Sequence, residues 1–408
     1  MTPSDRNRFR LTDDVGAALA DLAARHGYAS AREPARLGAE VRALSDIYNE
    51  MAAGVEVASS ARSHLGARLS FSLPRDMAKG ASAVRELISA GLIRGTTEKG
   101  VRVLDVGAGL GAMTFGLATA LANAGSTAPI DALLLDADGE ALRLAKEVAP
   151  IVAGSRTDLR VATSPLSVRE LGAVRTAFEL IFLGQVLSEL DPTLAPEARL
   201  TRHLELIRAL ANKLTPDGSL VIVEPALRNR TRHLHALRDA ILGVPWANVF
   251  APCVHLGLCP ALATEGDWCH DDLAIDLPEW LVPTAKAAGL RWEGLTFSYL
   301  VLRKDGKNLR GCLAEPNLVR VVSSLLKTKG KSEAFLCGDF ANAEGEGGVV
   351  SSRSKLRRLD RDAQDGNDAW ERIERGDLIG TPAPLPLGGR VKADMHVSLA
   401  TWKAFQGD

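Results

Sequence analysis

The stretch VRVLDVGAGLGA, residues 101–112, decides the fold. Its first half, Val101 to Val106, predicts a short buried strand, and the glycines that follow predict a tight turn into a helix over Ala112 to Ala124. Three more apolar runs predict central strands at residues 132–135, 180–183 and 219–223, with a helix at 139–148. Strands that alternate with helices in this way predict a doubly wound α/β fold built on a parallel sheet.

The glycine-rich turn predicts a cofactor site, because glycines between a strand and a helix let a ligand approach the backbone. The turn satisfies the dinucleotide pattern G-x-G-x-x-A through Ala112, so a nicotinamide cofactor is one interpretation. Asp105 favours another, since a carboxylate two residues before the first glycine repels a pyrophosphate and suits the ammonium group of S-adenosylmethionine. The third interpretation is a turn that binds no ligand and uses Asp105 as a cap.

Asp136 ends the second predicted strand, where it would accept hydrogen bonds from the ribose of either cofactor. The predicted cofactor-binding residues are Asp105, Gly107, Ala108, Gly109, Gly111, Asp136 and Gln185.

The residues that would carry out a methyl transfer are less evident. The Asn/Asp-Pro-Pro-aromatic turn of amino-directed nucleobase methylases is absent after residue 183, and no cysteine nucleophile precedes Pro252. Methyl transfer runs largely on positioning, so a missing base does not exclude activity. The catalytic candidates are Gln185, Glu189 and Glu224, with helix capping or solvation as the alternative role for each.

Composition narrows the class of protein. The 408 residues carry 49 Lys and Arg against 50 Asp and Glu, so the chain is not basic throughout. Five cysteines do not make a secreted disulfide scaffold. No apolar run approaches the ~20 residues that span a bilayer, so no membrane partner is expected. Acidic residues among the N-terminal arginines favour the cytoplasm over the mitochondrial matrix.

The cysteines gather late in the chain. Cys253, Cys259 and Cys269 lie within one irregular stretch, with Cys337 far downstream, and a metal would order such a loop. Thiolate-rich sets suit zinc or an iron–sulfur cluster, and the spacing favours iron–sulfur only slightly. His255 and His270 are alternative ligands, scattered buried thiols are the alternative to any metal, and Cys312 is expected to be a bystander.

Two basic clusters stand out against the near-zero net charge. Local clusters of this kind provide the phosphate contacts of nucleic-acid-binding proteins, although solvated helices carry charge runs too. The predicted RNA-binding residues are Arg228, Arg230, Arg232, Arg353, Arg357 and Arg358.

The pattern divides the chain into three segments, at 1–95, 96–304 and 305–408. The first is predicted to be helical and interrupted at Pro74. The second is the α/β domain with the cysteine-rich loop at 251–272, closed by an edge hairpin of 292–296 and 298–302. The third is an extension with a strand pair around 319–326 and 333–336 and a linker at 341–348.

Five segments together resemble the methyltransferase-like family associated with the small ribosomal subunit of mitochondria, of the methyltransferase-like protein 17 type. They are Leu104–Gly111, Val186–Leu190, Val223–Pro225, Cys253–His270 and Phe297–Leu302, and the resemblance covers about residues 60 to 375. The sequence departs from the family's pattern at two places. Val254 stands where relatives often have Pro, and Glu374–Asp377 stands where Trp-Gly-Asp is common.

The resemblance implies a class I (Rossmann-like) S-adenosylmethionine-dependent methyltransferase fold and a [4Fe–4S] cluster. It implies Cys253, Cys259, Cys269 and Cys337 as the cluster ligands, and a role in binding, methylating or assembling small-subunit ribosomal RNA. A monomer is expected. The alternatives are a non-catalytic ribosome-assembly factor that keeps the cofactor pocket, and a small-molecule methyltransferase with structural zinc.

Overall fold

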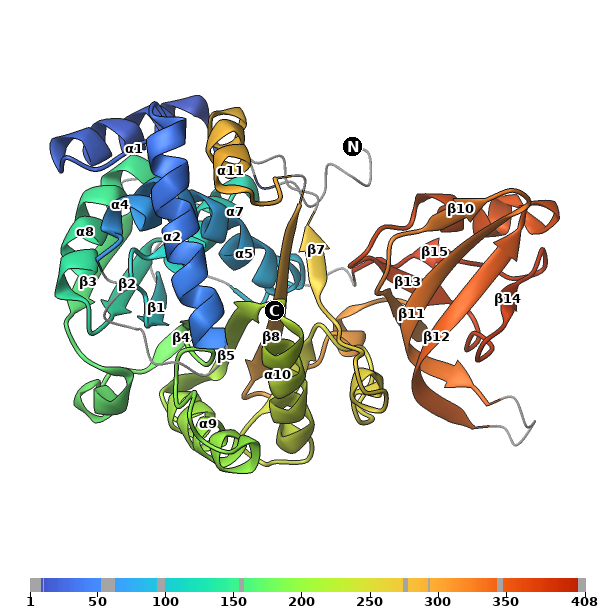
Figure 1. The fold of residues 1–408 in the computed structure, drawn as a ribbon. Coiled ribbons are helices and arrows are strands. Elements are labelled where there is room, and N and C mark those ends of the chain that lie inside the picture. The colour runs from blue at the N-terminus through green and yellow to red at the C-terminus, as the bar shows by residue number, and fades with distance from the viewer. Residues whose placement is uncertain are drawn as a thin grey trace. The chain divides into compact units, whose positions relative to one another are not determined.

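The computed structural model describes residue 9 and residues 11–52, 63–93, 100–153, 158–273, 278–292, 294–342 and 348–402 (Figure 1). By their contacts these residues form two compact units. The N-terminal unit contains residues 8–225 and 274–295, and the C-terminal unit contains residues 226–273 and 296–408. The predicted three-segment division stays a prediction. Its first boundary and most of the predicted linker, residues 343–347, lie outside the described residues.

Five parallel strands form the sheet of the N-terminal unit, in the order β3-β2-β1-β4-β5. They are β1 (Val101–Val106), β2 (Ile130–Leu135), β3 (Leu159–Ser164), β4 (Phe178–Gly184) and β5 (Leu214–Pro225). The apolar runs of β1, β4 and β5 are almost wholly buried, as expected for central parallel strands covered on both faces. The predicted parallel sheet is confirmed, whereas β3 was not predicted, because its residues are only half-buried and lack an apolar run.

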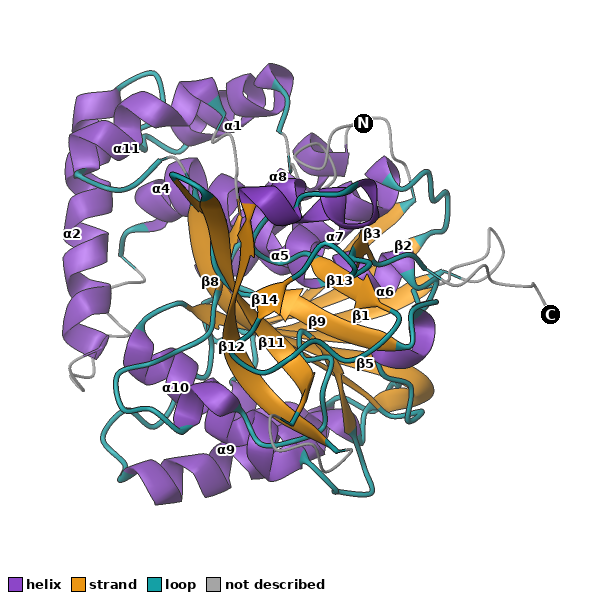
Figure 2. Cartoon of the chain, turned by 90° about the vertical axis from the view of Figure 1, so that its right-hand side faces the viewer, coloured by secondary structure: helices purple, strands orange, loops and turns teal. Residues whose placement is uncertain are grey.

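Helices connect and flank these strands (Figure 2). They are α7 (Ala112–Asn123), α8 (Gly139–Ala153), α9 (Pro196–Ala211) and α11 (Val282–Ala288). The order of the strands is that of a Rossmann-type sheet, in which ligands bind outside the carboxyl ends of the strands. None of the described helices is long and apolar enough to cross a membrane.

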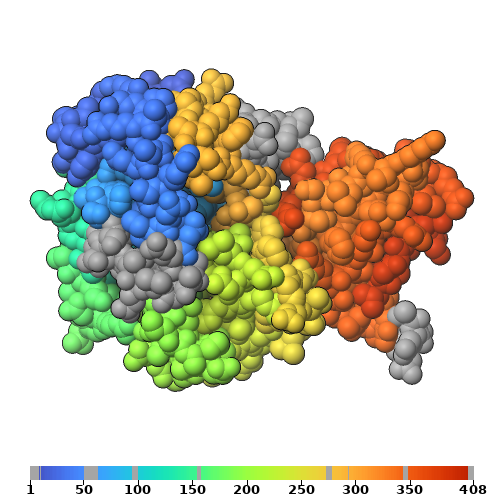
Figure 3. Space-filling model, in the orientation of Figure 1, coloured from blue at the N-terminus to red at the C-terminus, as the bar shows by residue number. Residues whose placement is uncertain are grey.

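The N-terminal helices supply more of the fold than their sequence predicts. They are α1 (Asp13–Arg25), α2 (Pro34–Ala52), α4 (Leu65–Ala67), a π-helical turn (Arg68–Ser72), α5 (Leu73–Ala83) and α6 (Arg85–Ser89). In Figure 3 the blue helices cover much of the visible surface of this unit. The predicted interruption at Pro74 is wrong. Pro74 lies in the first turn of α5, directly after the π-helical turn, where a missing backbone N–H is tolerated.

Two glycines allow α5 to pack closely on α7. A Cβ atom at Gly80 would lie 2.9 Å from Met113 Cα, and one at Gly116 would collide with the carbonyl oxygen of Met77. This contact fixes α5 beside the helix that follows the glycine-rich turn, so residues of α5 reach the cofactor side of the sheet.

The C-terminal unit begins with α10 (Arg228–Ile241), β6 (Asn248–Ala251), β7 (Asp271–Leu273) and β8 (Leu295–Arg303). β8 pairs with β6 in antiparallel fashion and also with β7. The predicted edge hairpin of 292–296 and 298–302 is wrong, because residues 295–303 form one continuous strand. Phe297, where the chain would have had to turn, is fully buried.

A second, mainly antiparallel sheet follows, in the order β14-β12-β11-β9-β13-β15, with β10 on β11. The strands are β9 (Asn317–Val321), β10 (Leu326–Thr328), β11 (Lys331–Ala341), β12 (Val349–Leu359), β13 (Leu378–Thr381), β14 (Arg390–Val391) and β15 (Ser398–Leu399). The predicted strand pair is confirmed as β9 and β11, joined by Val321 opposite Leu336. One face of the sheet buries Leu336, Phe340 and Leu356 around Trp370.

Candidate functional site

The glycine-rich turn has the backbone that only glycine adopts readily. Gly107, Gly109 and Gly111 have φ angles of 67°, 51° and 84°, all in the left-handed region. Gly111 is the residue before α7, and a Cβ atom there would lie 2.8 Å from Leu134 Cδ2. The N–H groups of Gly107 and Ala108 donate to Leu135 O, at 2.8 and 3.0 Å. The turn therefore brings the first turn of α7 to the carboxyl end of β1.

Asp105 is buried at that end of the sheet and held by α7. Its Oδ2 accepts hydrogen bonds from Thr114 N at 3.2 Å and from Thr114 Oγ1 at 2.8 Å. Burial raises the pKa of Asp105 to about 7, against the opposing effect of these hydrogen bonds. The carboxyl group lines the same cavity as the glycine-rich turn, where a cationic ligand group would favour its charged form.

Asp136 at the end of β2 contacts the protein's own backbone. Its Oδ2 accepts a hydrogen bond from Gly109 N, and its Oδ1 one from Asp138 N, both at 2.8 Å. Asp138 in turn pairs with Arg68, at 2.8 Å between Oδ2 and the guanidinium. Asp136 thus ties the glycine-rich turn to β2, and its predicted role at a ribose stays a prediction.

A cavity of about 300 Å³, which is within the size range of small-molecule sites, is lined by Asp105, Gly107, Ala108, Gly109, Asp136 and Asp138. Gly111 does not line it. Tyr48, Arg68, Ser72 and Asp76 from the N-terminal helices also line it. Sequence reasoning missed these four residues, because helical periodicity shows which face is apolar and does not show which polar residue the fold brings to a distant turn.

Gln185 follows β4 and lines the same cavity. Its φ of 62° is unusual for a residue other than glycine, and such backbone strain is concentrated at functional sites. Its Nε2 donates to Asp76 Oδ2 at 3.0 Å, and its Oε1 accepts from Lys79 Nζ at 3.2 Å. Lys79 and Asp76 also form an ion pair at 2.7 Å, so helix α5 fixes the orientation of the Gln185 amide.

The other two catalytic candidates, Glu189 and Glu224, differ in exposure. Glu189 is exposed and lines the cavity. Glu224 is buried, and its two oxygens accept hydrogen bonds from Leu187 N at 3.0 Å and Ser188 N at 3.1 Å. We therefore withdraw Glu224 as a catalytic candidate, because its carboxylate holds the turn after β4.

A second cavity, of about 60 Å³, lies within the C-terminal unit. It is too small for an organic cofactor and has room for a compact inorganic group. Cys253, Cys259, Cys269 and Cys337 all line it, and Cys312 does not. In the described part of the chain, no three His, Cys, Asp or Glu side chains are grouped so that they would hold a single metal ion.

Burial raises the pKa of Cys259 to about 12 and that of Cys269 to about 11, and the charge of Cys253 adds to both increases. Burial also raises the pKa of Cys337, followed by the charges of the other three cysteines. The four thiols are thus close enough to affect one another's ionisation. A positively charged group between them would favour the thiolate forms.

Two histidines approach the cysteines, and burial lowers the pKa of each to about 4, so both are neutral at pH 7. His235 Nε2 accepts a hydrogen bond from Cys269 N at 3.1 Å, and His255 Nε2 lies 3.6 Å from Cys337 Sγ. His255 Nδ1, His270 Nδ1 and Trp268 Nε1 are buried without a hydrogen-bond partner among the described residues. Two of these unpaired atoms belong to His255 and His270, which line the cysteine cavity.

Arginines hold the loop that carries three of the cysteines. Arg232 donates to the carbonyl oxygens of Ala261, Thr264 and Asp267, at 2.7 to 2.9 Å. Arg238, almost fully buried, donates to His255 O at 2.9 Å. These side chains satisfy the carbonyl groups that an irregular loop leaves unpaired.

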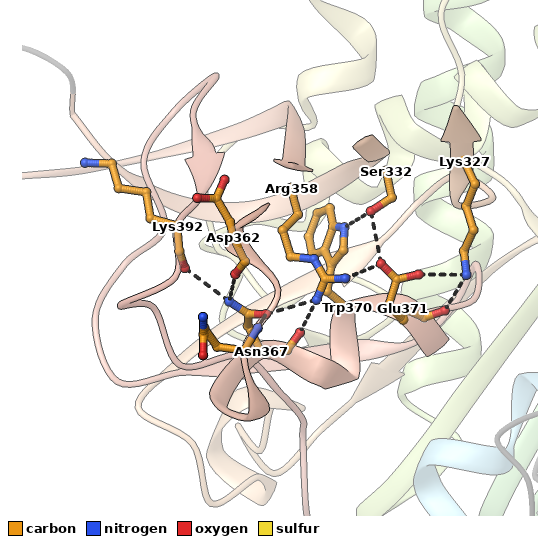
Figure 4. Close-up of polar contacts among 9 residues, drawn as sticks. Lys327, Ser332, Arg358, Asp362, Asn367, Trp370, Glu371 and Lys392 are labelled. Carbon is orange, nitrogen blue, oxygen red and sulfur yellow. Dashed lines mark hydrogen bonds and ion pairs between the residues drawn. The ribbon is translucent and has the colours of Figure 1, made fainter. Parts of the chain in front are cut away.

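The predicted RNA-binding arginines fall into three pairs that differ in exposure. Arg228 and Arg357 are exposed. Arg230 and Arg358 are buried, so we withdraw both as RNA contacts. Arg358 donates to Asn367 O and Asn367 Oδ1, at 2.9 Å each, and pairs with Glu371 (Figure 4).

The same network explains why Arg358 is buried. Asn367 Nδ2 donates to the carbonyl oxygens of Asp362 and Lys392, and Trp370 Nε1 donates to Ser332 Oγ at 3.0 Å (Figure 4). Arg358 thus pairs inside the C-terminal unit. Arg232 and Arg353 are half-buried. Arg232 donates hydrogen bonds to the loop carbonyls, and Arg353 forms an ion pair with Asp267 at 2.6 Å.

The strand order, the glycine-rich turn and the acidic ends of β1 and β2 define a class I methyltransferase fold. Residues 94–370 match the family described as mitochondrial small ribosomal subunit Rsm22. The chain belongs to this family, which confirms the resemblance drawn from the sequence. No curated protein matches the chain.

Solved structures of methyltransferases are similar to part of the chain. Magnesium protoporphyrin IX methyltransferase from Synechocystis PCC 6803, solved with bound S-adenosylmethionine, is 13% identical, with 56% of this chain and 79% of that chain covered and a TM-score of 0.33. TrmN from Thermus thermophilus is 19% identical, with 58% and 53% covered and a TM-score of 0.32. NSun6 from Pyrococcus horikoshii is 14% identical, with 54% and 52% covered and a TM-score of 0.33.

The chain thus spans about half the length of TrmN and of NSun6. At these levels of similarity, the fold assignment rests on the strand order and on the family match.

Proposed function

We propose that this chain is an S-adenosylmethionine-dependent methyltransferase that carries a [4Fe–4S] cluster and acts on small-subunit ribosomal RNA or in assembly of the small ribosomal subunit. The observation that carries the proposal is the cavity lined by Cys253, Cys259, Cys269 and Cys337, in a chain of the Rsm22 family. Membership of that family supports the ribosomal part.

The residues around the cysteine cavity fit a cluster. Each cysteine of a [4Fe–4S] cluster binds a different iron, so four thiols placed around a cavity suit this group better than they suit one zinc ion. Four arginines also line the cavity and favour a group with net negative charge; they are Arg238, Arg320, Arg353 and Arg375. His255, neutral at pH 7, is placed to donate Nε2–H to Cys337 Sγ at 3.6 Å. When bound, the cluster would order the loop and supply an electron-transfer group.

The cavity of the N-terminal unit fits S-adenosylmethionine. Asp105 would hold the ammonium group, and the backbone of the glycine-rich turn would allow the close approach that a side chain prevents. Gln185 and Glu189 would face the methyl acceptor. When bound, S-adenosylmethionine supplies an activated methyl group, and the protein's part is to orient the acceptor towards it.

One observation favours a second candidate, a non-catalytic assembly factor that retains the cofactor pocket. The amide of Gln185, which is expected to face the acceptor, is held by Asp76 and Lys79 of the protein itself. Such pairing suits a site that binds a cofactor and performs no chemistry.

The proposal is tested on the full chain purified without oxygen. We expect about four irons and four acid-labile sulfides per chain, and an absorption and electron paramagnetic resonance spectrum of a [4Fe–4S] cluster. A colourless, zinc-loaded protein would overturn the cluster. Transfer of a labelled methyl group to small ribosomal subunits, or to their RNA, tests the enzyme. Binding of S-adenosylmethionine without transfer would replace the enzyme by the assembly factor.

A further inference from the structure

One face of the hairpin β11–β12 is buried in the core. On the other face, Cys337 and Arg353 line the cysteine cavity, whereas Phe335, Lys355 and Arg357 are exposed. Side chains alternate along a strand, so Leu336 and Leu356 point into the core with Trp370, while their neighbours in sequence point outward. We call the outward surface the outer face. Its residues on β11 and β12 include Glu333, Phe335, Arg353, Lys355 and Arg357. Strands β10 to β12, in orange, form part of the visible surface in Figure 3.

An aromatic side chain lies on this solvent-exposed surface. Phe335 is 36% exposed, although the open face of an antiparallel sheet is usually polar. Lys355 lies directly opposite Phe335 across the two strands, and the Arg353 guanidinium carbon lies 5.6 Å from the centre of the Phe335 ring. Leu326, next to Glu333 on β10, is 56% exposed. The outer face thus combines apolar area with flanking positive charge.

The positive charges form a row along β12. Arg353, Lys355 and Arg357 are alternate residues, so their Cα atoms are about 6.7 Å apart, a spacing comparable with that of successive phosphates in an extended nucleic-acid strand. Arg353 pairs with Asp267 at 2.6 Å, and Lys355 pairs with Glu333 at 3.4 Å. Arg357 is exposed and has no ion pair in the described part of the chain. The row therefore keeps unneutralised charge.

A hollow adjoins the row. Arg353, Lys355 and Arg357 line it together with Glu333, Ser354 and residues 387–389. Part of its lining is the backbone of Gly388 and Gly389, where Gly388 N donates to Ser354 Oγ at 2.7 Å. Two residues without side chains leave room for a sugar and a phosphate beside the cations.

We infer that the outer face binds single-stranded RNA, with an unpaired base stacked on Phe335 and phosphates at Lys355 and Arg357. An exposed aromatic ring beside a row of cations is the arrangement that stacks unpaired bases, whereas duplex RNA keeps its bases stacked inside the helix. An acidic peptide would use the cations and would gain little from the ring. The inference rests on the proposed function, in that RNA of the small subunit is the ligand.

The test is fluorescence anisotropy of the full-length holoprotein with a labelled uridine-rich single strand, and with a duplex of the same length. We expect Phe335→Ala to weaken single-strand binding about tenfold without changing its salt dependence, because stacking is not an ionic contact. Phe335→Trp should restore binding, and Phe335→Leu should not. Lys355→Gln with Arg357→Gln should reduce the slope of log affinity against log salt by about 1.4.

Arg372→Gln is the matched control, because Arg372 is an exposed cation of the same unit that pairs with Asp368 and lies outside the row. Iron content and thermal unfolding show that each variant is folded. Unchanged binding by both Phe335→Ala and Phe335→Leu would overturn the inference, and so would equal binding of the duplex or of an acidic peptide. A chain that acts on small subunits but binds no single strand would overturn this inference alone. Single-strand binding without any action on small subunits would overturn only the proposed function.

Discussion

The two cavities of this chain are built in opposite ways. The cofactor cavity depends on a short local motif, Leu104–Gly111, and most of the polar groups described around it are paired with the protein itself. The cysteine cavity collects residues from a loop and from a strand far downstream, and buried ring nitrogens of His255 and His270, which line it, lack hydrogen-bond partners among the described residues. A site whose groups are paired is already organised before it binds a ligand, whereas a site with unpaired groups depends on its ligand for order.

The largest expected effect is therefore at the cysteine cavity. Cys259→Ser should lose essentially all bound iron and destabilise the loop at 251–272, because a serine hydroxyl replaces a buried thiol that we propose as a cluster ligand. Iron and sulfide analysis, the absorption spectrum and limited proteolysis measure this.

Cys312→Ser is the matched control, since Cys312 lies away from the cavity. It should retain the iron and change the unfolding free energy by no more than about 0.5 kcal/mol. Equal iron loss in the two variants would show that the ligand assignment is wrong and would remove the contrast between the two cavities.

The next effect concerns Asp105 and pH. Burial raises its pKa to about 7, so below that pH the carboxyl group must lose a proton before it can hold an ammonium group. The affinity for S-adenosylmethionine should therefore rise about tenfold per pH unit below pH 7 and level off above it. Titration calorimetry in buffers of different ionisation enthalpy would show the released proton. Asp105→Asn should abolish the pH dependence and weaken binding about tenfold to a hundredfold.

Asp131→Asn is the control, because Asp131 is a surface carboxylate on β2 that pairs with Arg160. In the protein without ligand, the raised pKa of Asp105 makes stability change with pH in the direction opposite to the affinity. The folded state keeps the proton between the ordinary pKa of 3.8 and about 7, so the contribution of Asp105 to the free energy of unfolding falls as pH rises through this window. Affinity that does not change with pH would mean that Asp105 does not contact the cofactor.

These contrasts also explain what the sequence could predict. The strand, glycine turn and helix of Val101–Asn123 depend on neighbouring residues, and the prediction matched the structure closely. The place of Cys337 in the same cavity as Cys253 depends on the antiparallel sheet that holds β11. The cysteine pattern suggested this grouping and the family resemblance supported it, but neither showed how the chain brings the two residues together. The prediction that Arg358 contacts RNA was wrong, because a run of charged residues does not show which of its members is buried. Asn367 and Glu371 pair with Arg358 inside the unit. A sequence predicts features that depend on neighbouring residues, but it does not predict which polar groups far apart in the chain will pair.

The smallest expected effect distinguishes Glu224, whose carboxylate holds a turn, from Glu189, whose carboxylate lines the cofactor cavity. Glu224→Gln should lower the free energy of unfolding by about 1–3 kcal/mol, because an amide accepts only one of the two hydrogen bonds from Leu187 N and Ser188 N and leaves a buried N–H unpaired. Glu189→Gln, on the exposed side of the same turn, should change it by no more than about 0.5 kcal/mol. Chemical denaturation of both variants measures the difference. An unfolding free energy unchanged in Glu224→Gln, together with lost methyl transfer, would return Glu224 to the catalytic candidates and show that the cofactor cavity keeps an acid or base for chemistry.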